Sequence, residues 1–354
     1  MPIGARKPTR ALFALLLLVP LAGYPNELDD QRHAHFRVQE VDPTPEVRGL
    51  RNDHYPASNE MRIDLFRPYV ENLGGAYMGV GTDQNLTFIA WARSDYAWLI
   101  DFDPVAVYVN RIHLFFISVS PTYQDFRALW DRGNRTRSWQ LLEATFGASE
   151  DFNRYREAWQ VAHRGSSDVP ERLNDLDRMA RNFGLRTFSN DPADYEYLRW
   201  MILNDRIQAI PGDLKGQTSI LNISRAARAM FLPIRLVYFS NAEEYMRYPD
   251  ALKQNIRLLP VDERSLAIRT CSVGARGFLG FPEGEKFPSD PLHYNLQPLA
   301  ALQEWMRVPG PFQVVEMLVG HRRLQPGLSI QENLPPVELP PLEIVGGRSH
   351  LRTN

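Results

Sequence analysis

The sequence predicts an α/β fold: a three-layer sandwich in which helices cover both faces of a mostly parallel sheet. Short, largely apolar runs alternate with amphipathic stretches through the middle of the chain. Apolar runs of this length are typical of strands buried on both faces, and such strands occur in parallel sheets covered by helices. A glycine turn directly follows the first run, and a strand, a glycine turn and a helix together open a βαβ unit.

The apolar runs define five expected strands, at 76–80, 97–102, 206–210, 234–239 and 265–270. Amphipathic stretches such as 105–117 and 219–230 separate them and are expected to form helices. In open α/β sheets the ligand lies beyond the carboxyl ends of the strands. We therefore expect the functional site where these five runs end.

A long helical stretch, from about 121 to 204, interrupts the alternation of strands and helices. Its periodicity predicts a helical insertion that caps the crevice and governs which substrate enters. Four tryptophans in it lie among apolar residues at helical spacing, so core packing is expected for Trp130, Trp139, Trp159 and Trp200. The predicted helices are 122–131, 138–146, 150–162, 171–183 and 192–204.

The N-terminus has the pattern of a secretory signal. Arg6, Lys7 and Arg10 precede an uncharged apolar stretch at 11–23, which is shorter than the roughly 20 residues that span a bilayer. We expect 1–23 to be a cleaved signal peptide and the mature chain to be periplasmic or extracellular. Tyr24 stands where a lipoprotein would carry cysteine, so the chain would touch a membrane only through an uncleaved leader.

Two further segments are expected to lie outside the main domain, which is predicted to span 59–324. Residues 24–58 are polar and lack an apolar period, which predicts a tether outside the core. Residues 325–354 are rich in proline and are expected to be extended or disordered. His33 and His35 lie in the tether without a third ligand at a suitable spacing, and no metal site is expected there.

Charge and composition exclude several classes of function. Without the leader, 37 Lys and Arg stand against 42 Asp and Glu, a net charge of −5 that does not suit a nucleic-acid surface. The single cysteine, Cys271, allows neither a disulfide within the chain nor a cysteine-based metal site, and it is expected in the core. No P-loop, no G-x-S-x-G turn and no local zinc-binding spacing is present, so no metal is expected.

The most informative motif is the glycine turn after the first predicted strand. Glycines at 79 and 81 allow a ligand to approach the backbone, and the following helix offers free N–H groups to it. Asp101 ends the second strand twenty residues after Gly81, where a carboxylate can accept ribose hydroxyls. A nicotinamide-dependent oxidoreductase is one interpretation, but Gln84 stands where the third glycine of that fingerprint is expected.

Four segments together carry a resemblance to known proteins: 79–90, 99–103, 212–216 and 237–243. Their order and motifs are similar to the class I methyltransferase-like (Rossmann-like) fold. More narrowly, the chain resembles an uncharacterised bacterial family that carries a G-V-G-x-[DE]-Q-N segment followed by an acidic strand. The resemblance spans roughly residues 70–272 and includes the helical insertion.

The resemblance implies positions for S-adenosylmethionine. The methionine end of the cofactor would lie at the glycine turn, the ribose at Asp101 or Asp103, and the adenine beside Asp213. Substrate would be oriented for methyl transfer after the fourth strand, at Ser240 and Asn241. The implied cofactor-binding set is Gly79, Gly81, Asp83, Gln84, Asn85, Asp101, Asp103 and Asp213.

The chain departs from the methyltransferase pattern in three ways that keep alternatives open. Asp83 replaces the third glycine of the methyltransferase loop, and its carboxylate can instead cap the following helix. Residues 240–243 lack the sequence that amino-methylating enzymes often carry. An exported protein would not meet a cofactor made in the cytosol. The interpretations are therefore a methyltransferase-like protein with a nucleotide-type pocket, an exported non-catalytic binding protein on the same fold, or a nicotinamide-dependent oxidoreductase.

A few other residues complete the expected site. Arg269 ends the fifth strand, where it could bind an anion in the crevice. His293 and Tyr294 are expected in a proline-rich loop that could close over the ligand, with Tyr294 contacting substrate. His113 is expected to be a hydrogen-bonded core histidine. The partner expected overall is a small or nucleoside-like molecule.

Overall fold

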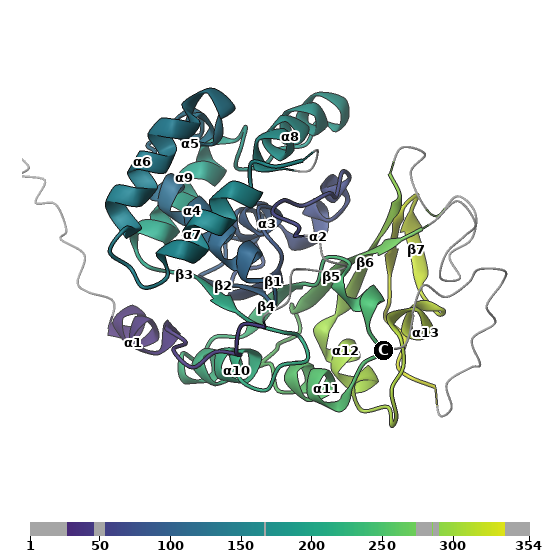
Figure 1. Cartoon of the computed structure of the whole chain (residues 1–354). Helices are drawn as coiled ribbons and strands as arrows, with labels where there is room; N and C mark the ends of the chain where they lie inside the picture. The colour runs from purple at the N-terminus through teal and green to yellow at the C-terminus, as the bar shows by residue number, and fades with distance from the viewer. Residues whose placement is uncertain (1–26, 46–53, 166–167, 274–284, 286–289, 337–354) are drawn as a thin grey trace, which may run out of the picture.

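The computed structural model describes residues 27–45, 54–165, 168–273, 285 and 290–336. It confirms the α/β fold: eight strands form one mixed, mostly parallel sheet with helices packed on it (Figure 1). All five predicted strands are present within two residues of their expected ends. They are β1 (Ala76–Val80), β2 (Tyr96–Asp101), β3 (Ile207–Pro211), β4 (Ile234–Tyr238) and β5 (Leu266–Ser272).

The strand order is β3-β2-β1-β4-β5-β6-β8-β7. The first five strands are parallel, and the order reverses between β1 and β4, which places a topological switch point there. Three further strands were not predicted. They are β6 (Leu292–Pro298), antiparallel to β5, β8 (Leu328–Ile330), parallel to β6, and β7 (Arg322–Gln325), antiparallel to β8.

Alternate residues of the central strands enter two different cores. In β2, Trp98 and Ile100 pack into the core beneath one face, and Ala97 and Leu99 pack into the core on the other. This follows from the two-residue period of a strand. It also explains why β2 is apolar up to its last residue, Asp101, since neither face of the strand meets solvent.

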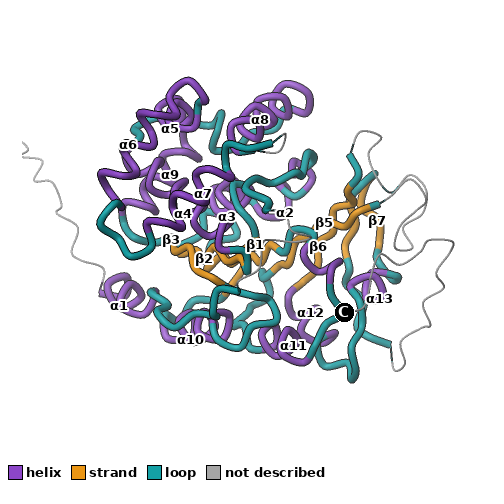
Figure 2. The backbone as a smooth tube through the Cα atoms, viewed as in Figure 1, coloured by secondary structure: helices purple, strands orange, loops and turns teal. Residues whose placement is uncertain are grey.

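Helices form the layers above and below the sheet (Figure 2). One face carries α2 (Arg67–Val70), α3 (Gln84–Ala92), α4 (Pro104–Val119) and the insertion. The other carries α1 (Glu27–Phe36), α10 (Ser219–Ala229), α11 (Asp250–Arg257), α12 (Leu299–Trp305) and α13 (Val314–Leu318). Short 3-10 helices occur at Ile63–Leu65, Arg132–Asn134 and Ala242–Tyr245.

The predicted helical insertion is present and forms a second layer of helices on α3 and α4. Thr122 begins its first helix with a capping box to Asp125, and Asp168 and Asp191 cap two later helices ahead of prolines. Helices α7 and α9 pack against α4. The helices are α5 (Tyr123–Trp130), α6 (Arg135–Phe146), α7 (Phe152–Val161), α8 (Val169–Phe183) and α9 (Pro192–Leu203).

The tryptophans of the insertion follow the prediction with one exception. Trp130 and Trp159 are buried, and Trp139 is half-buried against the core. Trp200 is 44% exposed, so the expected core role is wrong for it. It lies on the outer side of α9, where the guanidinium of Arg206 lies 4.7 Å from the centre of its ring.

The expectation of a polar tether is wrong for the described part of 24–58. Phe36 is fully buried, with its ring centroid 4.9 Å from that of Tyr96 and 5.2 Å from that of Trp98. The backbone of Val38 exchanges two hydrogen bonds with the side chain of Gln208, at 3.0 and 2.8 Å. Residues 27–45 therefore form an N-terminal arm that belongs to the fold, anchored by single residues rather than by an apolar period.

The expected boundary of the C-terminal tail is also wrong, because β8 lies within 325–354 and buries Leu328 completely. The leader at 1–23 and the end of the tail at 337–354 lie outside the described residues. Among the residues that are described, no helix is both long and apolar enough to cross a membrane.

Candidate functional site

The glycine turn lies at the switch point and has open space on one side. Gly81 has a φ of +90°, which favours glycine, and a Cβ atom built on it would meet no atom within 4 Å. Its N–H donates to Asp101 Oδ2 at 3.1 Å. At Gly79, by contrast, a Cβ would collide with the side chains of Asn85 and Tyr77, so the missing side chain there makes room for protein atoms.

Asn85 and Gln84 support the turn from inside the protein. The side chain of Asn85 accepts a hydrogen bond from Tyr77 at 2.6 Å and donates to the carbonyl oxygens of Val80 and Thr82. Gln84 Oε1 accepts a hydrogen bond from Arg172. Both side chains are buried, which makes them positioning residues of the turn.

Asp83 forms a buried ion pair instead of a helix cap. Its side chain makes no capping bond to α3 and accepts hydrogen bonds from Arg172 Nε at 2.9 Å and from the Ser58 N–H at 2.7 Å. Burial penalises the ionised carboxylate, but the charge of Arg172 and the N–H of Ser58 outweigh that penalty and lower the pKa of Asp83.

Arg172 was not identified from the sequence, because it lies 89 residues from Asp83 in the insertion. It is 2% exposed and also donates to the backbone carbonyl of Glu60 at 3.0 Å. The only local indication of its burial is its position next to the apolar residues of the amphipathic helix α8. Through it the insertion contacts the glycine turn directly.

Asp101 lies where the sequence predicted, between the glycine turn and the end of β2. Its carboxylate accepts the N–H groups of Gly81 and Asp103 and is 8% exposed. Burial is the largest cause that raises its pKa to about 7, and the charge of Asp103 adds to it. Asp103 caps α4 through the N–H of Val105 and contacts His54 Nδ1 at 2.9 Å, so its carboxylate is already engaged.

The raised pKa of Asp101 predicts an unusual pH dependence of stability. An unfolded aspartate has a pKa of about 3.9, so the native protein holds the proton of Asp101 more tightly than the unfolded chain does. The stability that this proton contributes is lost as pH rises from about 4 to about 7. Urea unfolding should be measured at pH 5 and at pH 8. Between these two pH values the free energy of unfolding of Asp101→Asn should rise by about 2–4 kcal/mol relative to that of the unsubstituted chain. The exposed Glu150→Gln should show no such change. An equal effect of Asp101→Asn at both pH values would contradict the burial argument.

A cavity of about 370 Å³ lies at the carboxyl ends of β2 and β3. Its volume falls within the usual range for small-molecule sites, roughly 300–1,000 Å³. Pro211 in its wall is paired in register with Asp101, so the cavity lies at the strand end that Asp101 occupies. Asp213 is half-buried, and its Oδ1 accepts the N–H of Lys215 at 2.8 Å. The lining residues are Asp42, Pro43, Pro45, Phe102, Pro211, Gly212, Asp213, Gly216, Gln217 and Thr218.

Asp42 of the N-terminal arm organises one wall of this cavity. Its carboxylate is 5% exposed and accepts the backbone N–H groups of Asp213, Gln217 and Thr218 at 2.9–3.2 Å. Its own N–H donates to Ser219 Oγ at 2.7 Å. The sequence did not indicate this role, because the surrounding segment carries no apolar period.

The carboxyl end of β4 is occupied by Glu60. Ser240 and Tyr238 donate hydrogen bonds to Glu60 Oε1 at 2.7 and 2.5 Å, and Glu60 is 1% exposed. Asn241 is half-buried and donates to the hydroxyl of Tyr245 at 3.3 Å. Ser240 and Asn241 are therefore near each other as predicted, but a carboxylate takes the place beside Ser240 that a substrate would need.

The prediction that Arg269 faces the crevice is wrong. Arg269 is fully buried and donates to Glu243 Oε2 at 2.5 Å, with further bonds to Asn295 and Gln297 at 2.9 and 2.8 Å. Its position on β5 puts it on the same face as Cys271, which is buried as predicted. Arg269 therefore points into the core beneath the sheet and is not available to an anion.

His293 and Tyr294 lie in strand β6 rather than in a loop, so the expected closure over the site is wrong. Tyr294 is fully buried and donates to Asp290 Oδ2 at 2.6 Å. Its hydroxyl accepts the N–H groups of Met61 and Arg62 at 3.1 and 2.8 Å. Its role is to anchor the segment that brings Glu60 to the switch point.

His113 is buried, as expected, but its two ring nitrogens have no hydrogen-bond partner among the described residues. The ring packs 4.8 Å from that of Trp130. Burial lowers its pKa to about 4, so it is neutral at physiological pH. The predicted hydrogen-bonded role is therefore wrong, although the core position is right.

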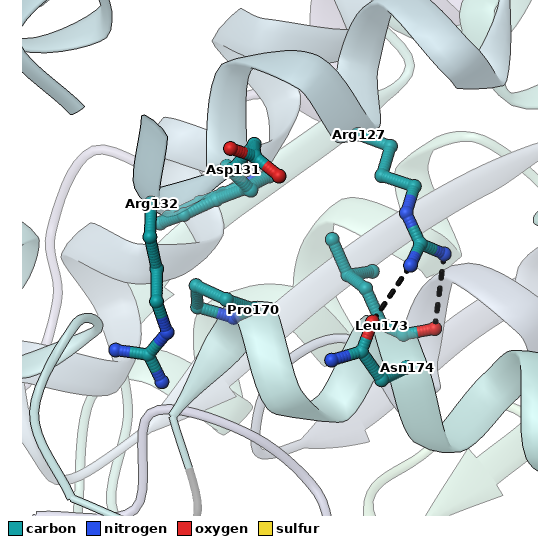
Figure 3. Close-up of a pocket in the computed structure, with 7 residues that line it drawn as sticks. Arg127, Asp131, Arg132, Pro170, Leu173 and Asn174 are labelled. Carbon is teal, nitrogen blue, oxygen red and sulfur yellow. Dashed lines mark hydrogen bonds between the residues drawn. The ribbon is translucent and has the colours of Figure 1, made fainter. Parts of the chain in front are cut away.

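A second, smaller cavity of about 120 Å³ lies between α5 and α8 (Figure 3). Arg127 donates to Asn174 Oδ1 at 2.7 Å and to the carbonyl of Leu173 at 3.5 Å, and Arg132 pairs with Asp168 at 2.6 Å. The cavity is too small for a nucleoside, and both arginines are already engaged. The lining residues are Arg127, Trp130, Asp131, Arg132, Pro170, Leu173 and Asn174.

Comparison with known proteins identifies a family whose function is unknown. A family model described as "Domain of unknown function (DUF7790)" matches residues 55–332, which is more than half of the chain. No curated protein matches the chain. The matched region contains the whole sheet and the insertion but not the N-terminal arm.

Proposed function

Since the chain belongs to the DUF7790 family of unknown function, we propose from its site that it binds a nucleoside-type ligand of the S-adenosylmethionine class. The observation that carries this proposal is the cavity of about 370 Å³ between the ends of β2 and β3. It lies at the end of β2, whose last residue is Asp101, and it is lined by Asp213. These are the two acids expected to meet a ribose and an adenine.

The strand order supports a methyltransferase-like ligand over a dinucleotide. Strands β3-β2-β1-β4-β5 are doubly wound, an order that dinucleotide-binding and class I methyltransferase folds share. The antiparallel strand β6 beside β5 resembles the methyltransferase sheet and departs from the dinucleotide-binding order. Gln84, turned inward to Arg172, leaves the dinucleotide fingerprint without its third glycine.

The proposed pose follows from the chemistry of the walls. Phe102 and three prolines offer apolar surface to a planar base, and Asp213 offers a carboxylate to an exocyclic amine. Asp101 would accept the ribose hydroxyls, which requires its ionised form. Because the pKa of Asp101 is about 7, ligand affinity should weaken below that pH.

A second candidate function is binding without methyl transfer. It is favoured by Glu60, which occupies the carboxyl end of β4 where a methyl acceptor would be oriented. The ion pair of Asp83 with Arg172 closes the neighbouring side of the glycine turn. This second candidate would be an exported protein that keeps the ligand pocket but has no room for a methyl acceptor at the end of β4.

Calorimetry on chain 24–354 with S-adenosylmethionine, S-adenosylhomocysteine and NADH tests the proposal. Saturable heat with the adenosyl compounds is expected. The affinity should fall at least about tenfold in Asp213→Ala, since a hydrogen bond to a charged group contributes about 1.5–3 kcal/mol. Glu150→Ala, which removes an exposed carboxylate away from the cavity, should bind normally.

Several outcomes separate the candidates. Absence of heat with both adenosyl compounds would refute the proposal, and heat with NADH alone would favour an oxidoreductase. Binding of S-adenosylmethionine without consumption of its methyl group in any acceptor screen would support the non-catalytic reading. Asp101→Asn should weaken binding at pH 8 and remove its pH dependence.

A further inference from the structure

Three potential metal ligands meet in the second half of the sheet, away from the glycine turn. Glu285 lies between β5 and β6, His293 is on β6, and His321 lies between α13 and β7. One ligand atom from each side chain lies within 4.8 Å of the others. They are separated by up to 36 residues in the chain, so no local spacing indicated them in the sequence.

The distances suit a small divalent cation. Glu285 Oε2 lies 3.7 Å from His293 Nδ1, and Glu285 Oε1 lies 3.7 Å from His321 Nε2. Tetrahedral zinc with bonds of about 2.0–2.1 Å holds its ligand atoms about 3.3 Å apart. The two carboxylate–imidazole distances are therefore within about 0.4 Å of the tetrahedral value. The two imidazole nitrogens lie within 4.8 Å of each other and would have to approach further.

The buried carboxylate provides an independent indication that a ligand is bound here. Glu285 is 5% exposed, and its Oε2 atom has no hydrogen-bond partner among the described residues. A buried carboxylate oxygen without a partner is costly, and a cation would compensate that cost.

Neighbouring groups orient the two imidazoles. His321 Nδ1 lies 2.7 Å from the carbonyl oxygen of Leu318, which makes Nδ1 the protonated nitrogen and leaves the Nε2 lone pair toward Glu285. His293 Nε2 lies 2.7 Å from Ser329 Oγ, which can accept its proton. His293 Nδ1 lies 2.6 Å from the Glu285 carbonyl oxygen, which only accepts, so in the metal-free protein Nδ1 carries the proton and Nε2 accepts from the Ser329 hydroxyl. A metal on Nδ1 would displace that proton to Nε2 and would require the Glu285 carbonyl to move away.

We propose that Glu285, His293 and His321 form a zinc site with one open coordination position. Two imidazoles and one carboxylate are a ligand set that zinc uses in proteins, usually with water in fourth place. Bound zinc would link Glu285 to His293 on β6 and to His321 ahead of β7. The inference uses none of the residues of the proposed nucleoside site.

Calorimetric titration of ZnCl₂ into the metal-stripped full chain tests the site. One equivalent of zinc is expected to bind, with affinity reduced at least about 100-fold in Glu285→Gln and in His321→Ala, since loss of even a supporting hydrogen bond costs 10–100-fold. Co²⁺ in place of zinc should give visible absorption typical of tetrahedral coordination, and the variants should lose it. The double variant His33→Ala/His35→Ala, which removes the two histidines of α1, should bind zinc normally.

Thermal unfolding of the metal-free proteins shows whether Glu285→Gln, an isosteric change, retains the fold. Failure of the folded full chain to bind zinc would overturn the proposal. So would zinc binding that survives in both site variants or disappears in the His33/His35 double variant. Because these titrations contain no nucleoside, their outcome is independent of the adenosyl-binding experiment.

Discussion

Replacement of Arg172 by methionine is expected to lower the free energy of unfolding by about 3–5 kcal/mol, because it leaves a buried charge without its partner. Asp83 is 1% exposed, and Arg172 is its only cationic hydrogen-bond partner among the described residues. The variant also deprives Gln84 and the carbonyl of Glu60 of a donor. Chemical denaturation monitored by tryptophan fluorescence measures the change.

Two companions separate the charge effect from the loss of packing. The double variant Asp83→Asn/Arg172→Met should recover much of the loss, since replacing both members of a buried pair is often close to neutral. Arg178→Met on the same helix removes an arginine whose side chain is 43% exposed and paired with Glu171 and Asp175, and should cost less than about 1 kcal/mol. If Arg172→Met lowered the free energy of unfolding no more than Arg178→Met does, the stabilising role of the buried pair between Asp83 and Arg172 would be contradicted.

Replacement of Phe36 by alanine should cost about 3–5 kcal/mol, as truncation of a buried phenylalanine usually does. Phe36 is fully buried against Tyr96 and Trp98, and its carbonyl oxygen accepts the indole N–H of Trp98 at 3.3 Å. Truncation removes the aromatic contacts that hold the N-terminal arm on the sheet. The change is measured by denaturant unfolding of chain 24–354.

Leu28, on the same helix but 47% exposed, supplies the matched control. Leu28→Ala should change stability by no more than about 0.5 kcal/mol, as surface substitutions usually do. If the segment were a polar tether, both substitutions would be equally harmless. Nearly equal and small effects would therefore restore the tether that the sequence predicted.

Much of the sheet could be predicted because its central strands are apolar on both faces. β1 and β2 carry this pattern and end in a glycine turn and an acid, which located the ligand edge. β6 could not be predicted in the same way, since it reads Leu-His-Tyr-Asn-Leu-Gln-Pro. Its polar residues are buried because they satisfy Arg269 and Ser329, contacts that depend on distant parts of the chain.

The candidate site shows the same division. The position of Asp101 beside the glycine turn could be predicted because it depends on a short spacing from Gly81, and its contact with a ribose stays a prediction. Glu60, Arg172 and Asp42 could not be found, since each acts on a strand end more than eighty residues away along the chain. Buried polar side chains of this kind are specified by tertiary partners rather than by local pattern.

The position of Asp42 has a consequence for how this pocket can vary. Asp42 shapes the wall formed by 213–218, yet it precedes the region 55–332 that defines the family. One wall of the cavity therefore comes from strand ends inside the matched region, and another comes from the N-terminal arm, which lies outside it. Changes confined to the arm can alter which molecules fit while leaving every strand of the sheet in place.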